Sequence, residues 1–184
     1  MDLLSLLNEK IFLGQEFLTW LWYLCETEPV LTLPDGRSVE LMLGDRLLLG
    51  PAMGQEGTRV SVTGREASLA EARQALKRGK LVEAIRLGIM IDGEEYMLSL
   101  NAAELAIGAL KTPATAPAEG GPEGIDGLVL ERVALIDAVV RGLEGLLGLF
   151  LRGRLADDAG GELWANLRAW AQAGPAGAAE ATEA

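Results

Sequence analysis

The sequence predicts an α+β protein with an N-terminal aromatic helix, a small antiparallel sheet of hairpins and a C-terminal amphipathic helical hairpin. Three observations favour this class. An aromatic segment near the N-terminus repeats its apolar residues with a helical period, the middle of the chain alternates apolar and polar residues between turn signals, and the C-terminal third returns to a helical period. The 184 residues are enough to bury a proper core.

The aromatic segment, residues 12–26 (FLGQEFLTWLWYLCE), holds most of the aromatic side chains of the chain. A helix with one buried face has apolar residues at positions i, i+3, i+4 and i+7, and this spacing is found at Phe17, Trp20, Leu21 and Leu24. Each aromatic side chain removes roughly 150–250 Å² from water on burial, so this helix can nucleate the core. A ligand pocket or a groove for a partner is the alternative interpretation. Gly14 either separates this helix from an amphipathic segment at 2–10 or lies within one continuous helix.

Two hairpins are predicted from their turns. The first has Pro-Asp-Gly-Arg at 34–37 and the second has Asp-Gly at 92–93, which are signals for tight turns. Their strands are the extended segments 30–33, 38–43, 81–90 and 94–100. The sequence also predicts two more short strands, at 47–49 and 58–63. It further predicts a helix that begins with a capping box at Ser68 and ends at Arg78, and a brief helix at 102–110.

A segment rich in proline and glycine, residues 111–126, is expected to be a flexible linker. It separates an α+β region at 1–110 from a helical region at 127–173. The tail at 174–184 has nothing to bury and is expected to be disordered. Within the helical region, helices are predicted at 128–154 and 162–173.

The longer of these helices carries a heptad seam, in which apolar residues recur at steps of four and three. The heptad seam consists of Val129, Val133, Ile136, Val140, Leu143, Leu147 and Phe150. Two interpretations remain open: the seam packs on the protein's own core, or it is the interface of a homodimer or larger assembly. Gly142, Gly145 and Gly148 line another face of the helix and indicate that something packs closely against it.

The chain has no histidine, which excludes imidazole general-base chemistry and most zinc sites. Its single cysteine, Cys25, can form no intrachain disulfide, which fits a reducing cytoplasm. We find no phosphate loop or cofactor motif and therefore expect no catalytic residue, no cofactor and no metal. No apolar run reaches about 18 uncharged residues and no basic signal start is present, so we expect neither a membrane span nor a targeting segment.

Carboxylates near the second hairpin raise one enzymatic hypothesis. They are Glu83, Asp92, Glu94 and Glu95. A metal-dependent nuclease needs carboxylates that converge at strand ends. The other interpretation is that they form a solvated edge and turn.

One segment is basic within an acidic chain. Residues 65–86 hold six cations against three carboxylates, whereas the whole chain has a net charge of −11. The cations are Arg65, Arg73, Lys77, Arg78, Lys80 and Arg86. Such a cluster at the end of a helix can bind phosphates, or it can complement the helix dipole.

The segment 68–100 resembles the C-terminal part of the RdgC family of recombination-associated proteins. In that family a helix is followed by a G-K-x-V-like step into a strand, a polar turn and a second strand, and Gly79, Lys80 and Val82 match this step. Residues 127–148 (GLVLERVALIDAVVRGLEGLLG) resemble the family's final amphipathic helix. The stretch FLGQEFLTWLWY is similar to a motif of short RdgC-like proteins.

This resemblance implies a bacterial, non-enzymatic protein that binds double-stranded DNA without strong sequence preference. It also implies a ring-shaped dimer with a positively charged hole that modulates RecA-driven recombination. By resemblance, Arg73, Lys77, Arg78 and Lys80 would face the DNA. The alternative is a subunit that joins a homo- or hetero-oligomer through its C-terminal helix and makes no direct DNA contact.

Overall fold

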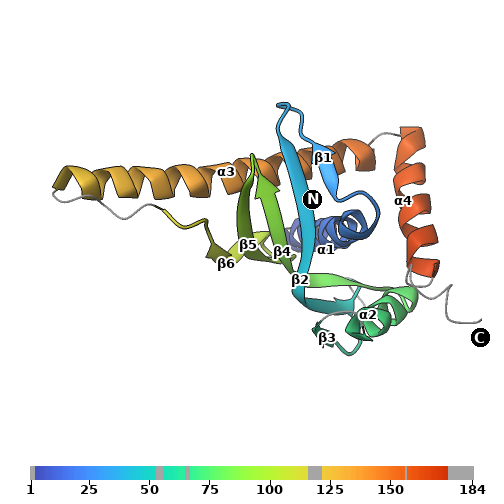
Figure 1. The fold of residues 1–184 in the computed structure, drawn as a ribbon. Coiled ribbons are helices and arrows are strands. Elements are labelled where there is room, and N and C mark those ends of the chain that lie inside the picture. Colours follow the sequence, from blue (N-terminus) through green and yellow to red (C-terminus); the bar gives the residue numbers. More distant parts are fainter. Residues whose placement is uncertain (1–2, 53–55, 65–66, 116–121, 156, 174–184) are drawn as a thin grey trace, which may run out of the picture.

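The computed structural model describes residues 3–52, 56–64, 67–115, 122–155 and 157–173. It confirms the α+β class, since the described residues form four helices and a six-stranded antiparallel sheet (Figure 1). In chain order the elements are α1 (Leu3–Thr27), β1 (Val30–Thr32), β2 (Ser38–Pro51), β3 (Val60–Thr63), α2 (Ala67–Lys77), β4 (Lys80–Ile91), β5 (Glu94–Asn101), β6 (Ala106–Lys111), α3 (Pro122–Leu155) and α4 (Asp157–Gln172).

The sheet has the strand order β1-β2-β4-β5-β6, and β3 pairs with β2. Both predicted hairpins are confirmed. In the β4–β5 turn, Asp92 and Gly93 have φ of 52° and 85°, as a two-residue type I′ turn requires. In the β1–β2 turn, Gly36 has φ of 88°, and the amide of Arg37 donates a hydrogen bond to Asp35 Oδ1 at 3.1 Å. Local turn chemistry therefore sets the register of both hairpins.

β2 is one long strand where the sequence predicted two short ones. Its pairing with β4 shifts register between Leu43 and Leu47 and again between Leu48 and Leu49. Such bulges bend a strand and increase its twist. On its other edge, the far half of β2 pairs with β3.

The helix predicted at 102–110 is wrong, because this segment turns and forms β6 against β5. The amide of Ala103 donates a hydrogen bond to Asn101 Oδ1 at 2.8 Å, which is a local alternative to helical pairing. Leu105 has φ of 51°, outside the right-handed helical region. The chain then returns with Ile107 paired to Leu100.

α1 is continuous and passes through Gly14 without a break. A Cβ at Gly14 would collide with the carbonyl oxygen of Ala102. Glycine therefore lets the turn before β6 lie directly on the helix. The helix packs on β4 and β2, so the aromatic segment is a core helix, as predicted.

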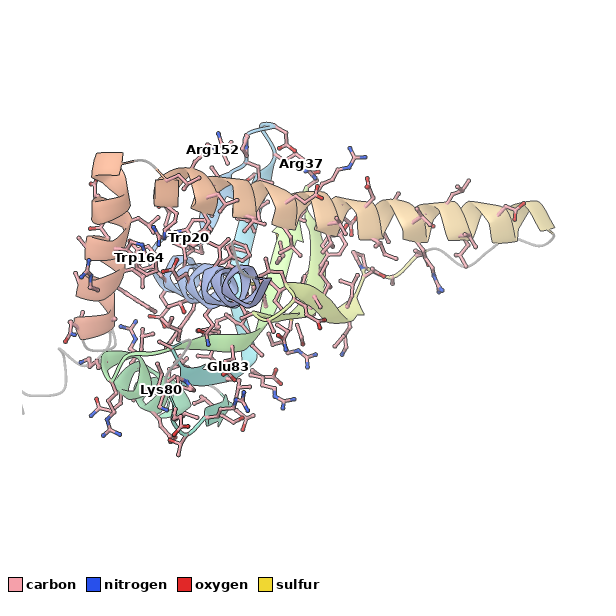
Figure 2. All side chains as sticks on the ribbon, turned by 180° about the vertical axis from the view of Figure 1, so that it is seen from behind. Trp20, Arg37, Lys80, Glu83, Arg152 and Trp164 are labelled. Atoms are coloured by element: carbon pink, nitrogen blue, oxygen red, sulfur yellow. The ribbon has the colours of Figure 1, made fainter. Side chains whose placement is uncertain are left out.

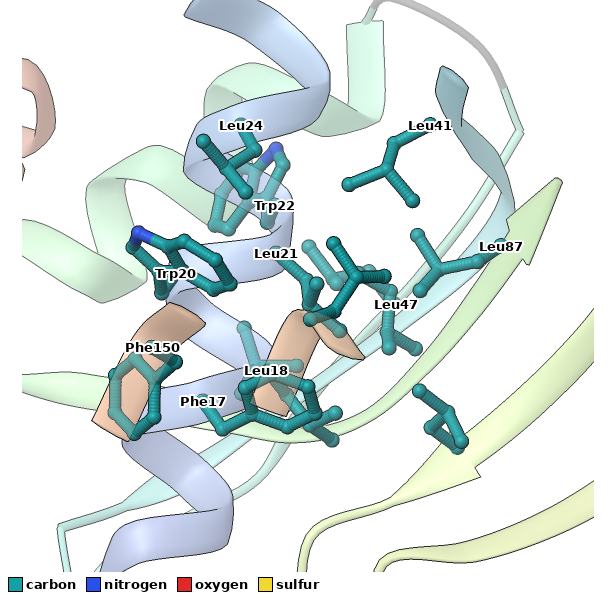
Figure 3. Packing of buried hydrophobic residues seen from close by; sticks show 14 of the residues in the cluster. Phe17, Leu18, Trp20, Leu21, Trp22, Leu24, Leu41, Leu47, Leu87 and Phe150 are labelled. Carbon is teal, nitrogen blue, oxygen red and sulfur yellow. The ribbon is translucent and has the colours of Figure 1, made fainter. Parts of the chain in front are cut away.

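The predicted apolar stripe of α1 is buried, and the close view in Figure 3 shows its packing. The ring of Phe150, from α3, lies 5.5 Å from the ring of Phe17 and 5.6 Å from that of Trp20. Trp170, from α4, meets Trp22 edge to face at 5.0 Å. The N-terminal region and the C-terminal helices therefore share one hydrophobic core.

α3 begins at Pro122, inside the segment predicted as a linker, and proline is favoured in the first turn of a helix. Lys111 belongs to β6, and residues 112–115 have no regular structure. The rest of the predicted linker, 116–121, and the tail at 174–184 lie outside the described residues. α4 lies across the end of α3 rather than back along it (Figure 1), because it also packs on α1 and α2.

Two of the three glycines on the second face of α3 are closely packed, as the sequence indicated. A Cβ at Gly142 would lie 2.7 Å from Ile91 Cδ1, and a Cβ at Gly145 would lie 3.0 Å from a methyl group of Leu33. A Cβ at Gly148 would meet nothing within 4 Å. Close packing therefore accounts for the first two glycines only.

Candidate interaction surface

The N-terminal part of α3 projects past the edge of the sheet (Figures 1 and 2). We call residues 126–138 the α3 arm. Four large apolar side chains on it are exposed, namely Val129 (53%), Leu130 (69%), Val133 (56%) and Ile136 (46%). Adjoining apolar side chains in contact with water mark surfaces that interact with other molecules.

The heptad seam is therefore divided between two environments. Leu143 and Phe150, in its C-terminal half, are buried in the protein's own core. Val129, Val133 and Ile136, in its N-terminal half, stay exposed. The prediction that the seam packs on the same chain is confirmed for one half, and the prediction of an interface between copies stays open for the other.

An apolar groove of about 160 Å³ lies where the two halves meet. Val140 and Leu147 of the seam line it from α3, and Leu105 and Ile107 line it from the turn before β6 and from β6. Glu144 is its one charged lining residue among the described side chains. The exposed stripe of the α3 arm thus leads into a hollow with apolar walls.

A second stripe, one residue out of phase with part of the seam, holds α3 against the sheet and α1. Val139 and Leu146 are fully buried, whereas their neighbours Val140 and Leu147 are half-buried. The sequence analysis missed this stripe because adjacent positions carry equally apolar side chains with the same period. Helical periodicity alone does not decide which of two neighbouring stripes faces the core.

Arg73 does not belong to the basic surface that the sequence predicted. It is 5% exposed and forms an ion pair with Glu26 of α1. Its Nη1 donates to the carbonyl oxygens of Trp170 at 3.1 Å and Ala173 at 3.4 Å, and its guanidinium carbon lies 4.6 Å from the centre of the Trp170 ring. Burial lowers the pKa of Arg73. Arg73 therefore joins α1, α2 and the end of α4, and it offers no charge to an external phosphate.

Glu26 is the residue that collects these contacts, and the sequence analysis did not single it out. Its Oε1 accepts a hydrogen bond from Trp22 Nε1 at 2.7 Å, and its Oε2 accepts from Trp170 Nε1 at 3.2 Å as well as from Arg73. A partly exposed carboxylate at the end of an aromatic helix has no distinctive sequence signal, because two of its partners, Arg73 and Trp170, lie 47 and 144 positions away in the chain.

The other predicted nucleic-acid-binding residues are spread over several elements. Lys80 Nζ donates to the carbonyl oxygen of Thr58, and Arg86 forms an ion pair of 3.6 Å with Asp45 on β2. Lys77 and Arg78 are exposed at the end of α2 and have no ion pair within the described residues. Arg65 lies outside the described residues. Of the five predicted cations in the described part of the chain, Lys77 and Arg78 are therefore the two for which the structure shows neither an ion pair nor a hydrogen bond of the side chain.

The carboxylates near the second hairpin do not converge. Glu83 lies near the start of β4, where Arg59 Nε donates to its Oε2 at 2.6 Å. Asp92 lies in the turn after β4, and Glu94 and Glu95 begin β5, so about nine residues of strand, or about 30 Å, separate these three from Glu83. Among the described residues no group of three acidic, cysteine or histidine side chains could hold a metal ion. The arrangement does not favour a two-metal nuclease.

A polar cavity of about 390 Å³ borders Gln15 of α1, Arg59 and Glu83. Gln15 Nε2 donates to the carbonyl oxygen of Pro51 at 3.2 Å, while its buried Oε1 has no hydrogen-bond partner in the described structure. Arg59 and Glu83 form an ion pair at 2.6 Å, so this pair and the amide oxygen of Gln15 are polar groups at the cavity.

The chain's one thiol is not activated for chemistry. Burial raises the pKa of Cys25 to about 12, and a nucleophilic cysteine needs the opposite shift. Burial likewise raises the pKa of Glu16 above its ordinary value, and this desolvation outweighs the opposing effect of Arg154 at 3.0 Å. Glu16 contacts an arginine from α3, which gives it a structural partner rather than a substrate.

None of the helices in the described ranges has the length and hydropathy needed to cross a membrane. No protein-family model matches the chain, and comparisons with curated proteins and with solved structures gave no significant match.

Proposed function

We propose that this protein is an assembly module that docks a helix of another protein subunit onto the α3 arm. The observation that carries the proposal is the exposed heptad stripe Val129, Val133 and Ile136 on a helix that projects from a well-packed body. Apolar residues at heptad spacing are the surface that a second helix covers by knobs-into-holes packing.

The limited stability of a free α3 arm supports the same proposal. The 13 residues of the arm span about 20 Å and extend α3 beyond its packed part, whereas most helical stability in proteins comes from tertiary packing of an apolar face. Gly127 and the β-branched residues Val129, Val133 and Ile136 lower its intrinsic helix propensity further. A docked partner would bury the stripe and stabilise the arm as a helix.

A photo-reactive residue in place of Val133 tests the proposal in cells that produce the full chain. We expect covalent adducts with a protein, because Val133 is at the centre of the exposed stripe. The same residue in place of Glu131 is the matched control, since Glu131 is exposed on the opposite side of the helix. Equal yields of adduct at the two positions, or none at either, would contradict the proposal.

A second candidate function is non-specific binding of double-stranded DNA, as the RdgC resemblance implies. The observation that favours it is the pair of exposed cations Lys77 and Arg78 at the end of α2, next to the Gly79-Lys80 step that carries the resemblance. This surface offers two positive charges on a chain of net charge −11, which is little positive charge for binding a polyanion.

If the protein has this second function, we expect it to bind a DNA duplex at low salt. The variant that combines Lys77→Glu with Arg78→Glu should lose this binding. Binding should also weaken steeply as salt is added, because phosphate contacts release counterions. The control is Arg132→Glu with Arg152→Glu, which makes the same change of charge at two exposed positions of another helix, α3. Binding that is absent, or that both variants reduce equally, would rule this function out.

A further inference from the structure

We propose that the polar cavity between α1, β2 and β4 binds a free α-amino acid. Its volume of about 390 Å³ is within the range of small-molecule sites. Among the described residues, the polar side chains that line it are Gln15, Arg59, Glu83 and Asn101. No described residue of α3 lines it, so this site is separate from the docking surface on the α3 arm.

Gln15 supplies a hydrogen-bond acceptor that no described residue uses. Its side chain is 3% exposed, and its Oε1 has no hydrogen-bond partner in the described ranges. The hydrogen bond from Nε2 to the carbonyl oxygen of Pro51, at 3.2 Å, sets the orientation of the amide, because the reverse orientation would bring two oxygens together. Buried polar atoms in proteins are nearly always hydrogen-bonded. A ligand N–H at this oxygen would therefore remove the cost of burying it unpaired.

Glu83 brings a second acceptor to the same cavity. Its Oε2 accepts from Arg59 Nε at 2.6 Å, and its Oε1 has no hydrogen bond with any described residue. Gly50 of β2 makes room for this carboxylate, since a Cβ at Gly50 would collide with it. The next residue, Pro51, is the one that holds the Gln15 amide. Two acceptors at one cavity suit an ammonium group, which has three N–H donors.

Arg59 and Asn101 supply donors. Among the described residues, Glu83 is the one partner of the Arg59 guanidinium, and it uses Nε, so the Nη groups remain to donate. Asn101 Oδ1 accepts from the amide of Ala103 at 2.8 Å, which leaves Nδ2 of Asn101 as its donor. A guanidinium binds a carboxylate through two parallel N–H groups. These donors therefore suit the carboxylate of a ligand.

The ion pair between Arg59 and Glu83 can open for a ligand at small cost. The Arg59 side chain is 69% exposed, and an ion pair with an exposed partner contributes little stability. An α-amino acid at neutral pH has an ammonium group for Glu83 and Gln15 and a carboxylate for Arg59, so two ion pairs replace one. An amine or a carboxylic acid satisfies only one of the two charges. The site therefore favours a ligand that carries both.

Hydrogen bonds hold the walls of the cavity in place. Thr19 Oγ1 donates to the carbonyl oxygen of Gln15 at 2.7 Å and accepts from the amide of Val82 at 3.1 Å, which ties α1 to β4 next to Glu83. The amide of Ala102 donates to the carbonyl oxygen of Glu83 at 2.8 Å, which fixes the turn after β5 beside them. A site whose polar groups are already in place loses less entropy on binding.

Glycine, L-alanine and L-leucine are the probes, because the other lining residues, Leu48, Ala102 and Ala103, are apolar. Calorimetric titration of the full chain measures the affinity. We expect at least one of the three to bind. The corresponding amine, which lacks the carboxylate, and the corresponding carboxylic acid, which lacks the ammonium group, should bind at least about tenfold more weakly, since each loses one set of charge-assisted hydrogen bonds.

Glu83→Gln and Arg59→Gln should each weaken binding by about tenfold or more, because each removes one of the two charges. Arg141→Gln is the matched control. Arg141 is 65% exposed and forms an ion pair of 2.8 Å with Asp137, but it does not line the cavity, so its loss should leave binding unchanged. The proposal is overturned if none of the three amino acids binds at millimolar concentration, if the amine or the acid binds as tightly as the amino acid, or if Arg141→Gln weakens binding as much as Arg59→Gln.

Discussion

Replacing Glu26 with alanine is expected to lower the free energy of unfolding by about 3 kcal/mol, because it leaves a buried guanidinium without its carboxylate. Arg73 is 5% exposed. Glu26 also accepts hydrogen bonds from the indole N–H groups of Trp22 and Trp170. The figure is at the lower end of the range for buried pairs because the Glu26 side chain is itself 22% exposed. Urea unfolding followed by tryptophan fluorescence measures the change.

Asp137→Ala is the matched control, since it also removes a carboxylate from an arginine. Asp137 and Arg141 form an exposed i, i+4 ion pair at 2.8 Å, and such pairs contribute about 0.3–0.5 kcal/mol. Glu26→Leu combined with Arg73→Met should recover much of the loss, because it removes both charges together. Similar destabilisation by Glu26→Ala and Asp137→Ala would show that the contacts of Arg73 do not hold the helices together.

Gly14→Ala is expected to destabilise the protein by about 3 kcal/mol, at the upper end of the cost of overpacking a close-packed site. The new Cβ would collide with the carbonyl oxygen of Ala102 and lie 2.8 Å from its carbonyl carbon, and backbone atoms cannot turn aside as a flexible side chain would. Thermal unfolding followed by circular dichroism measures the change.

Gly148→Ala is the matched control, because Gly148 is also a glycine inside a helix, and we expect it to change stability in the opposite direction. Gly148 lies inside α3 and has open space at its Cβ position, so alanine should raise stability by about 0.5–1 kcal/mol through its higher helix propensity. If Gly14→Ala and Gly148→Ala shift the unfolding temperature in the same direction, close approach of the backbone is not the reason for glycine at position 14.

The elements that the sequence predicts well are those set by neighbouring residues. The Asp92-Gly93 turn fixes both strands of its hairpin, since its φ angles need these residue types. The segment 102–110, which turns and then forms β6, has helix-forming residues, such as Ala102 and Leu105. It forms a strand because it pairs with the edge of β5, and this contact cannot be predicted from local secondary-structure propensity.

The candidate surfaces were predictable in part. Arg73, Lys77 and Lys80 have the spacing of a basic face, but Arg73 lies on the buried side of α2 between Ala72 and Leu76, with its partner on another helix. The sequence places Val129, Val133 and Ile136 on one helical stripe, and the structure shows all three exposed. Which half remains exposed depends on where the sheet ends beneath α3, and the sequence of the helix does not record that position.

We propose that another protein helix covers the exposed stripe of the α3 arm. The ratio of photo-adduct formed from Val133 to that formed from Glu131 tests this, because the two positions lie on opposite sides of the same exposed helix. We expect a protein adduct at Val133 in clear excess over Glu131. A ratio near one would mean that this face of α3 has no docked partner, and it would contradict the proposed function.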